Sequence, residues 1–350
     1  MLKLFIGPEK DGVGIIRLLA KYRGINKTSS QLFQPVNVPV EDIFCIVNSI
    51  SDADAILFPH DYASVKNDDD FIATYEKLSE VYNKKIIVFS VSDRDIFVLF
   101  KNAIILRTSA YRYKLRSNEI IVAPFIEDMG LLYGVSVRHK TNASPIVGFA
   151  GLAQWWTIYA RVKAYVKQFL LSCRVLYTGR EEIRAHTQGI FIRRQALRAL
   201  GMFQGVRLCV IIRNSFSGLA RTINVPQKQL RDEYVEIMQQ SDFCLAPKGD
   251  GNYSLRFFET LALGRIPVLV DTEMVLPFED KINYDNVIIR VPLRDIKSIG
   301  NIIANTYMNM TDEDFVQRQH YARKIFEDFL RPEKFYAILF SELATQFHSG

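Results

Sequence analysis

The strongest signal in this chain is the stretch of residues 243–270, which reads FCLAPKGDGNYSLRFFETLALGRIPVLV. It joins two apolar runs through a polar, glycine-rich loop and a helix-like segment. The runs Phe243–Ala246 and Ile266–Val270 have the length and composition of buried strands. Gly249 and Gly251 permit a sharp turn and a close approach of a ligand to the backbone. The stretch is either an ordinary surface turn or a loop that holds a ligand at a helix N-terminus.

The helix predicted inside this stretch runs from Leu255 to Leu263. Ser254 is its predicted N-cap, and Gly264 is predicted to end it in the left-handed conformation. Free backbone N–H groups and Arg256 would face a nucleotide diphosphate, and Glu259 would accept from ribose hydroxyls. The alternative is that Arg256 and Glu259 form a surface ion pair and the glycines only turn the chain.

Apolar, strand-like runs alternate with helix-length segments along the whole chain. This alternation is typical of an α/β protein with parallel sheets covered on both faces. The predicted strands are Leu2–Ile6, Ala55–Phe58, Lys85–Phe89, Ala103–Leu106, Ile120–Val122, Pro145–Ala150, Val206–Ile212, Phe243–Ala246, Ile266–Val270 and Val287–Val291. The predicted helices are Ile15–Tyr22, Phe71–Tyr82, Trp155–Ser172, Gln195–Leu200, Gln229–Gln240 and Arg256–Leu263.

A polar stretch, Val137–Ser144, marks the expected boundary between two domains. It predicts an N-terminal domain over residues 1–140 and a C-terminal domain over residues 145–320, both Rossmann-like. Residues 321–350 are helical in pattern and are expected to pack back on the N-terminal domain. Ligands of open parallel sheets bind beyond the carboxyl ends of the strands, so a cleft between the two sheets is the expected site.

Composition is that of an ordinary globular protein, with 49% hydrophobic and 23% charged residues and a formal net charge of +6. These values exclude disorder, and no basic–aromatic motif points to a nucleic-acid partner. The sequence contains no apolar run of membrane-spanning length. The four cysteines are predicted to be buried free thiols, which favours a reducing, cytoplasmic location. They are Cys45, Cys173, Cys209 and Cys244. The mild positive charge leaves open a peripheral contact with the inner face of an anionic membrane.

The opening stretch and the residues around it closely resemble the signature of the exostosin family of glycosyltransferases. The resemblance is carried by Ser241–Pro247 (SDFCLAP), Ser254–Arg256 (SLR), Glu259, Gly264–Val268 (GRIPV) and Leu276–Phe278 (LPF). Fainter likeness extends to Ala55–Pro59, Asn118–Phe125 and Ile146–Gly151. The match is specific over about forty residues and weak over most of the remaining chain.

The resemblance implies a GT-B fold with two Rossmann-like domains facing a cleft. It implies inverting transfer from a nucleotide sugar, usually a uridine diphosphate (UDP) sugar, without a bound metal or other cofactor. Arg256 and Glu259 would belong to the donor site, which Gly249, Asp250, Tyr253 and Ser254 would line. Animal and plant members carry a Golgi membrane anchor, and this sequence shows none. The expected acceptor is therefore a glycan or lipid-linked glycan of a surface polysaccharide, such as capsule or O-antigen.

Three further residues are candidates for the donor side. Gly151 follows a predicted strand, where a small residue leaves room for a phosphate or a sugar, although it suits a plain strand-to-helix turn equally well. Arg213 lies just past another strand of the same sheet and could neutralise the leaving diphosphate. Arg180 is a second cation for that role. Either arginine is equally consistent with an ordinary surface position.

Inverting transfer needs a general base near the acceptor hydroxyl. The candidates lie at strand ends of the N-terminal domain. Asp61 and Asp93 rank first, followed by His60, with Glu127 and Asp128 also considered. An aspartate directly after a strand is more often a turn or helix cap than a base.

Two other functions stay open. The chain could be a non-catalytic GT-B partner subunit that retains the fold and has lost the active site. It could also be another nucleotide-binding enzyme, such as a sugar epimerase. The glycine loop Gly7–Gly14 disfavours the epimerase, because Arg17 stands where a dinucleotide loop has its third glycine. Several Asp-x-Asp pairs are assigned to helix caps and strand starts, and no metal site is predicted.

Overall fold

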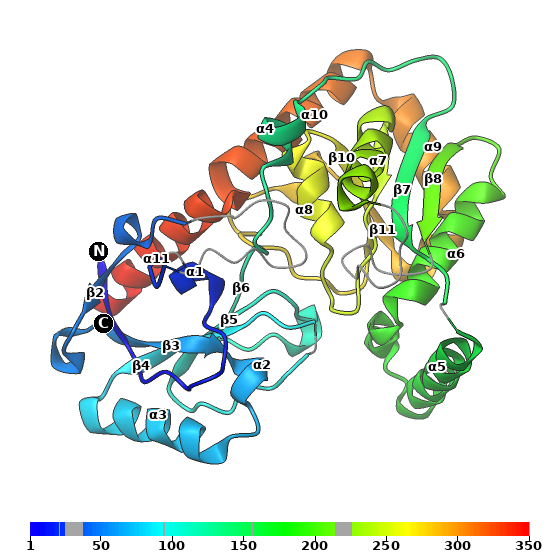
Figure 1. The fold of residues 1–350 in the computed structure, drawn as a ribbon. Helices are drawn as coiled ribbons and strands as arrows, with labels where there is room; N and C mark the ends of the chain where they lie inside the picture. The colour runs from blue at the N-terminus through cyan, green and yellow to red at the C-terminus, as the bar shows by residue number, and fades with distance from the viewer. Residues whose placement is uncertain (21, 25–37, 94, 156, 214–225, 350) are drawn as a thin grey trace.

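The computed structural model describes residues 1–20, 22–24, 38–93, 95–155, 157–213 and 226–349, and it divides into two α/β halves (Figure 1). The first half is built on a six-stranded parallel sheet of order β2-β1-β3-β4-β5-β6. Its strands are β1 (Leu2–Ile6), β2 (Phe44–Val47), β3 (Ala55–Asp61), β4 (Lys85–Ser90), β5 (Ala103–Arg107) and β6 (Glu119–Ile121). Its helices are α1 (Arg17–Ala20), α2 (Tyr62–Val65), α3 (Asp69–Tyr82) and α4 (Met129–Tyr133).

The second half is built on a five-stranded parallel sheet of order β11-β10-β9-β7-β8. Its strands are β7 (Ile146–Leu152), β8 (Arg207–Arg213), β9 (Phe243–Leu245), β10 (Ile266–Asp271) and β11 (Ile289–Pro292). Its helices are α5 (Ile158–Thr178), α6 (Gly189–Gly201), α7 (Gln227–Gln240), α8 (Leu255–Ala262) and α9 (Ile299–Asn309). The predicted α/β class with two parallel, Rossmann-like sheets is confirmed, and this is the GT-B architecture.

The central predicted strands form because their apolar runs are buried on both faces, whereas β8, at the edge of its sheet, is half-buried or exposed throughout. Residues 55–60 of β3 and all three residues of β9 are buried. Each predicted strand begins within two residues of the first residue of an observed strand. Strand β2 was not predicted. Helix α1 is much shorter than the predicted Ile15–Tyr22, whereas α5 extends six residues beyond the predicted end at Ser172.

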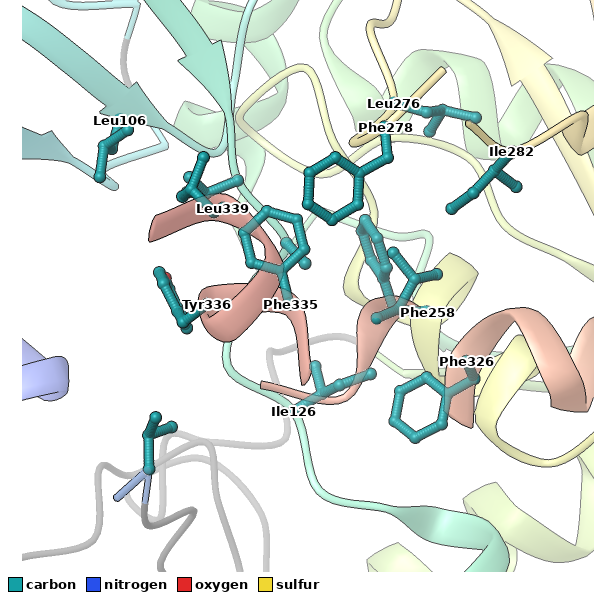
Figure 2. Packing of buried hydrophobic residues seen from close by; sticks show 14 of the residues in the cluster. Leu106, Ile126, Phe258, Leu276, Phe278, Ile282, Phe326, Phe335, Tyr336 and Leu339 are labelled. Carbon is teal, nitrogen blue, oxygen red and sulfur yellow. The ribbon is translucent and has the colours of Figure 1, made fainter. Parts of the chain in front are cut away.

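The C-terminal helices cross from the second half to the first. Helix α10 (Asp312–Ile325) continues through a π-helical turn, Phe326–Leu330, into α11 (Pro332–His348). Tyr336 of α11 packs against Phe89 and Phe125 of the first half, with ring centroids 6.2 and 5.1 Å away. Its neighbour Phe335 lies 4.6 Å from the ring of Phe278 in the second half (Figure 2). One hydrophobic cluster therefore spans both halves.

The expectation of four buried thiols is wrong for three of the cysteines. Cys45 and Cys173 are exposed, Cys209 is half-buried and only Cys244 is buried. Cys45 lies on β2 at one edge of its sheet, and Cys209 on β8 at one edge of the other, where one strand neighbour is missing. Cys173 lies on α5, a helix whose outer side faces solvent.

Candidate functional site

The loop between β9 and α8 is fixed against the first half of the molecule. Its central residue, Asn252, is buried and bonds across the domain boundary. Its backbone N–H donates to Ser109 Oγ (2.8 Å), and its side-chain amide donates to the carbonyl oxygen of Ala110 (2.8 Å). The amide oxygen accepts from Thr272 Oγ1 at the end of β10 (2.6 Å). The loops at the carboxyl ends of the two sheets are therefore in direct contact.

Helix α8 begins where the sequence predicts, with Ser254 at the N-cap position. The Ser254 side chain makes no capping hydrogen bond, so the expected side-chain cap is wrong in that detail. Gly264 ends the helix at a φ of +63°, which confirms the predicted left-handed cap. The helix buries Phe257, Phe258 and Leu261 and leaves its first turn partly exposed beside the end of β7.

Arg256 points from α8 to the carboxyl end of β7. Its guanidinium donates to the carbonyl oxygen of Ala150 and lies over the ring of Phe149, 4.3 Å from its centroid. Gly151 makes this approach feasible, because a Cβ there would lie 2.7 Å from Arg256 Nη2. The space that Gly151 leaves is therefore filled by Arg256 in this structure. Among the described residues, Arg256 Nε is buried and has no hydrogen-bond partner.

A second arginine, Arg193 of α6, lies at the same strand end. Its Nη1 donates to the carbonyl oxygen of Leu152 (3.0 Å), and its Nε is buried without a partner in the described part of the chain. Burial, followed by the positive charge of Arg256, lowers the pKa of Arg193 to about 10. Two neighbouring guanidinium groups at one strand end with unused N–H donors are well suited to an anion.

Glu259 does not pair with Arg256, so the predicted alternative of an Arg256–Glu259 surface ion pair is wrong. One carboxylate oxygen accepts from the hydroxyl of Tyr234 (2.5 Å), and the other accepts from Arg231 Nη1 (3.2 Å). Arg231 also binds Glu127 of the interdomain segment (2.7 Å). Glu127 and Asp128 were considered as bases, but each is held by an arginine, Asp128 by Arg323.

Lys248, in the same loop as Asn252, contacts Tyr111 of the first half and so also joins the two halves. The Lys248 ammonium is buried and donates to the carbonyl oxygen of Ala185 (2.7 Å) and to the hydroxyl of Tyr111 (3.1 Å). Burial lowers the pKa of Lys248 to about 7, and the nearby charge of Asp250 opposes the shift. The Tyr111 ring lies against His186, with centroids 4.0 Å apart.

The remaining candidate donor-site residues differ in their exposure and in their partners. Asp250 is exposed at the tip of the loop, and its charge acts on Arg193. The backbone N–H of Gly249 donates to the carbonyl oxygen of Tyr253, which closes the turn (3.0 Å). Arg213 ends β8 and pairs with Glu233 of α7 (2.7 Å). Arg180 is exposed and pairs with Glu182 (2.7 Å). Both arginines are thus partly neutralised by their own carboxylates.

Two of the base candidates are already held by the backbone. His60 is fully buried, with Nε2 accepting from the N–H of Lys10 (2.8 Å) and Nδ1 facing the carbonyl oxygen of Gly14 (3.0 Å). Its ring therefore positions the glycine loop. Asp61 caps α2 through the N–H of Ala63 and also accepts from the N–H of Val91, both at 3.3 Å. Burial raises the pKa of Asp61.

Asp93 lies opposite the donor loop. Its carboxylate accepts from the hydroxyl of Tyr253 across the domain boundary (2.7 Å), and its backbone carbonyl lies beside Gly251. Arg17 at the start of α1 is exposed, and desolvation lowers its pKa. Asp93 and Tyr253 thus meet where the two halves of the molecule face each other.

The fold defines the class first: two Rossmann-like parallel sheets joined at their strand carboxyl ends make a GT-B-type protein. Residues 206–306 match the Exostosin GT47 domain. It is 35% identical over 101 residues to an exostosin-1 homolog of Caenorhabditis elegans, covering 29% of this chain and 25% of that protein. It is 36% identical over 77 residues to a probable glucuronosyltransferase of Oryza sativa, covering 22% of this chain and 19% of that protein.

The chain thus matches a quarter or less of the length of these relatives. Its fold is also similar to a solved structure of Anabaena HepE in complex with UDP-glucose, at 12% identity and a TM-score of 0.40 over 99% of this chain and all of that one.

Sequence reasoning missed Arg193, Lys248 and Asn252. Arg193 stands in a helix whose charged residues are all arginines, and in the run FIRRQ no motif separates it from its neighbour Arg194. Lys248 and Asn252 are in the quoted loop, but nothing in the sequence marks them as buried, since lysine and asparagine are mostly exposed in proteins. Arg17 was noted only as a departure from a dinucleotide loop.

Proposed function

We propose that this protein transfers a sugar from a UDP-sugar to a glycan acceptor. The observation that carries the proposal is the pair Arg193 and Arg256 at the end of β7, beside the first turn of α8. Both guanidinium groups are held by backbone carbonyls and keep a buried, unpartnered Nε within the described residues. A diphosphate there would receive charge-assisted hydrogen bonds and the positive end of the α8 dipole. The exostosin match, residues 206–306, covers α8 with Arg256 and the strands β9 and β10.

In this proposal the second half of the chain binds the donor and the first half binds the acceptor. The acceptor oxygen attacks the anomeric carbon of the donor sugar, the bond from that carbon to the diphosphate oxygen breaks, and UDP leaves. Inversion follows from this single displacement. The acceptor proton passes to a base, for which we propose Asp93, with Asp61 second. Asp93 is preferred because it lies across from the donor loop, whereas Asp61 caps a helix.

Glu259 enters the proposal as a positioning residue. It fixes Tyr234, whose ring faces the guanidinium of Arg256 at 5.5 Å. Tyr253, Ser254, Gly249 and Asp250 would line the donor, with Arg213 and Arg180 at its rim. The acceptor class proposed is a glycan or a lipid-linked glycan of a surface polysaccharide.

The test is calorimetric titration of the full chain with UDP and a panel of UDP-sugars. We expect Arg256→Ala and Arg193→Ala each to weaken UDP binding by about tenfold to a hundredfold, since a charge-assisted hydrogen bond contributes about 1.5–3 kcal/mol. Arg198→Ala is the matched control: Arg198 is on the same helix as Arg193 but lines a separate cavity between α5 and α6. Absence of UDP binding, or binding equal in all variants, would refute the donor site.

Turnover is tested separately with Asp93→Asn. We expect transfer to fall at least a hundredfold while UDP affinity changes less than about twofold, because general-base catalysis contributes about 10²–10⁴-fold. We also expect transfer to persist in a chelator, since the arginine pair supplies positive charge at the diphosphate. Full transfer by both Asp93→Asn and Asp61→Asn would refute the assignment of the base.

One observation favours a second function, that of a non-catalytic partner subunit. Asp93 is occupied by Tyr253, and the Glu259 carboxylate is occupied by Tyr234 and Arg231. UDP binding without transfer to any glycan acceptor would support this alternative.

A further inference from the structure

Helix α5 exposes large apolar residues to solvent, whereas a helix of a globular domain normally turns such residues toward the core. Ile158, Val162, Phe169 and Leu176 are 82%, 55%, 67% and 79% exposed. At about 100° of rotation per residue, these four side chains fall within about 40° of one another. The buried residues of the helix, Ala164 and Val175, lie on the opposite side. The outer face of α5, which includes Val166 and Tyr177 on its flank, is thus a continuous apolar stripe.

Basic residues border this stripe, and no acidic residue occurs in the helix. Lys163, Lys167 and Arg174 lie together along one border, and Arg161 lies along the other. Figure 1 shows α5 at the lower right, standing off the body of the molecule below α6. At one edge of the stripe, Tyr165 contacts Phe191 of α6 (centroids 5.1 Å apart), and the buried side of the helix faces the molecule. The outer face therefore has room to meet a large flat surface.

We propose that the outer face of α5 docks the protein onto an anionic lipid bilayer, with the helix lying in the plane of the interface. An apolar stripe bordered by lysine and arginine is the arrangement that binds such a surface: the stripe enters the acyl boundary and the bases contact lipid phosphates. Tyr177, at the end of the helix, suits the headgroup zone. No helix in the described part of the chain is long and apolar enough to cross a membrane.

The charges of α5 favour a bilayer over a second copy of the chain. Two α5 helices that met through their apolar stripes would bring two sets of four cations together without a carboxylate on either helix. Like charges across such an interface are unfavourable, whereas an anionic lipid surface complements them. The proposal is independent of the transfer reaction, although a lipid-linked acceptor would place its substrate at the same surface.

Vesicle flotation of the full chain tests the apolar stripe. The vesicles contain equal parts of phosphatidylglycerol and phosphatidylcholine. We expect Phe169→Ser combined with Leu176→Ser to lower the partition coefficient at least about tenfold. Leu99→Ser combined with Met308→Ser is the matched control, since those residues are 61% and 65% exposed but lie elsewhere. A thermal unfolding midpoint close to that of the parent chain shows that each variant is folded. Equal partitioning of both double variants would overturn the proposal.

A second pair of variants tests the charges. We expect Lys163→Gln combined with Lys167→Gln to weaken binding roughly fivefold per charge at low salt. We expect wild-type binding to fall as salt rises and to be weakest on pure phosphatidylcholine. Binding that is the same on both vesicle types would refute the anionic surface. A different outcome would identify a second copy of the chain as the occupant. In that case the wild type would not bind vesicles but would self-associate, and the variant with Phe169→Ser and Leu176→Ser would be monomeric.

Discussion

At the residue scale, Gly151 and Arg256 form one unit. The φ of Gly151 is +154°, and only a residue without a Cβ leaves space for the guanidinium of Arg256 to reach the carbonyl oxygen of Ala150. The sequence indicated that a small residue mattered at this strand end, but it could not show that the space is used by a side chain of the protein.

Gly151→Ala should weaken UDP binding about tenfold or more, because the new methyl group displaces the Arg256 guanidinium. Gly201→Ala is the control, since a Cβ there would lie 3.7 Å from the nearest atom, a normal contact distance. Calorimetric titration with UDP measures both. Unchanged affinity in Gly151→Ala would show that Arg256 is not needed where the structure places it.

Also at the residue scale, the lowered pKa of Lys248 predicts that the free energy of unfolding depends on pH. Its pKa is about 7 in the folded protein and about 10.4 in the unfolded chain. Between these values the unfolded chain holds more protons, so the free energy of unfolding should rise with pH across this window. Below pH 7 the lysine is charged in both states, and the cost of burying it is fully present.

Lys248→Met should flatten this rise. Urea unfolding of both proteins from about pH 6 to about pH 10 gives the comparison, and its readout is the slope with pH rather than the stability at one pH. An equal slope in the two proteins would show that Lys248 stays protonated throughout.

At the element scale, α7 and α8 are joined by Glu259. Its two partners, Tyr234 and Arg231, precede it by 25 and 28 residues and belong to a different helix. Both helices were predicted from apolar spacing to within two residues at each end. The partner of Glu259 was not predicted, because spacing within one helix identifies neighbours on that helix and carries no information about the helix beside it.

Glu259→Gln and Tyr234→Phe should each lower the free energy of unfolding by about 1–3 kcal/mol, since each removes a buried, charge-assisted hydrogen bond. The double variant should lose less than the sum, with a coupling energy of about 1 kcal/mol. Urea unfolding of the four proteins measures the cycle. Additive losses would show that the 2.5 Å contact contributes nothing to stability.

At the scale of the whole molecule, α11 holds the two halves together. Phe335 is fully buried against Phe278 of the second half, and its neighbour Tyr336 packs on the first half (Figure 2). Because one hydrophobic cluster spans both halves, we expect them to unfold together.

Phe335→Ala should lower the free energy of unfolding by about 3–5 kcal/mol through the cavity it leaves. We expect a single calorimetric transition at a lower temperature. Gln346→Ala, an exposed change on the same helix, should have little effect. Two separate transitions, only one of which shifts, would show that the halves unfold independently.

The sequence by itself determined the strand–loop–helix–strand stretch at residues 243–270, the parallel sheets and the exostosin resemblance. These features depend on local apolar spacing, on the positions of glycine residues and on a short run of matched residues, and all three can be read directly from the sequence. Folding in three dimensions brings Arg193 to Arg256, pairs Glu259 with Tyr234 and turns the apolar side of α5 outward. Those facts depend on which surfaces meet after folding, and one-dimensional spacing does not record which elements become neighbours.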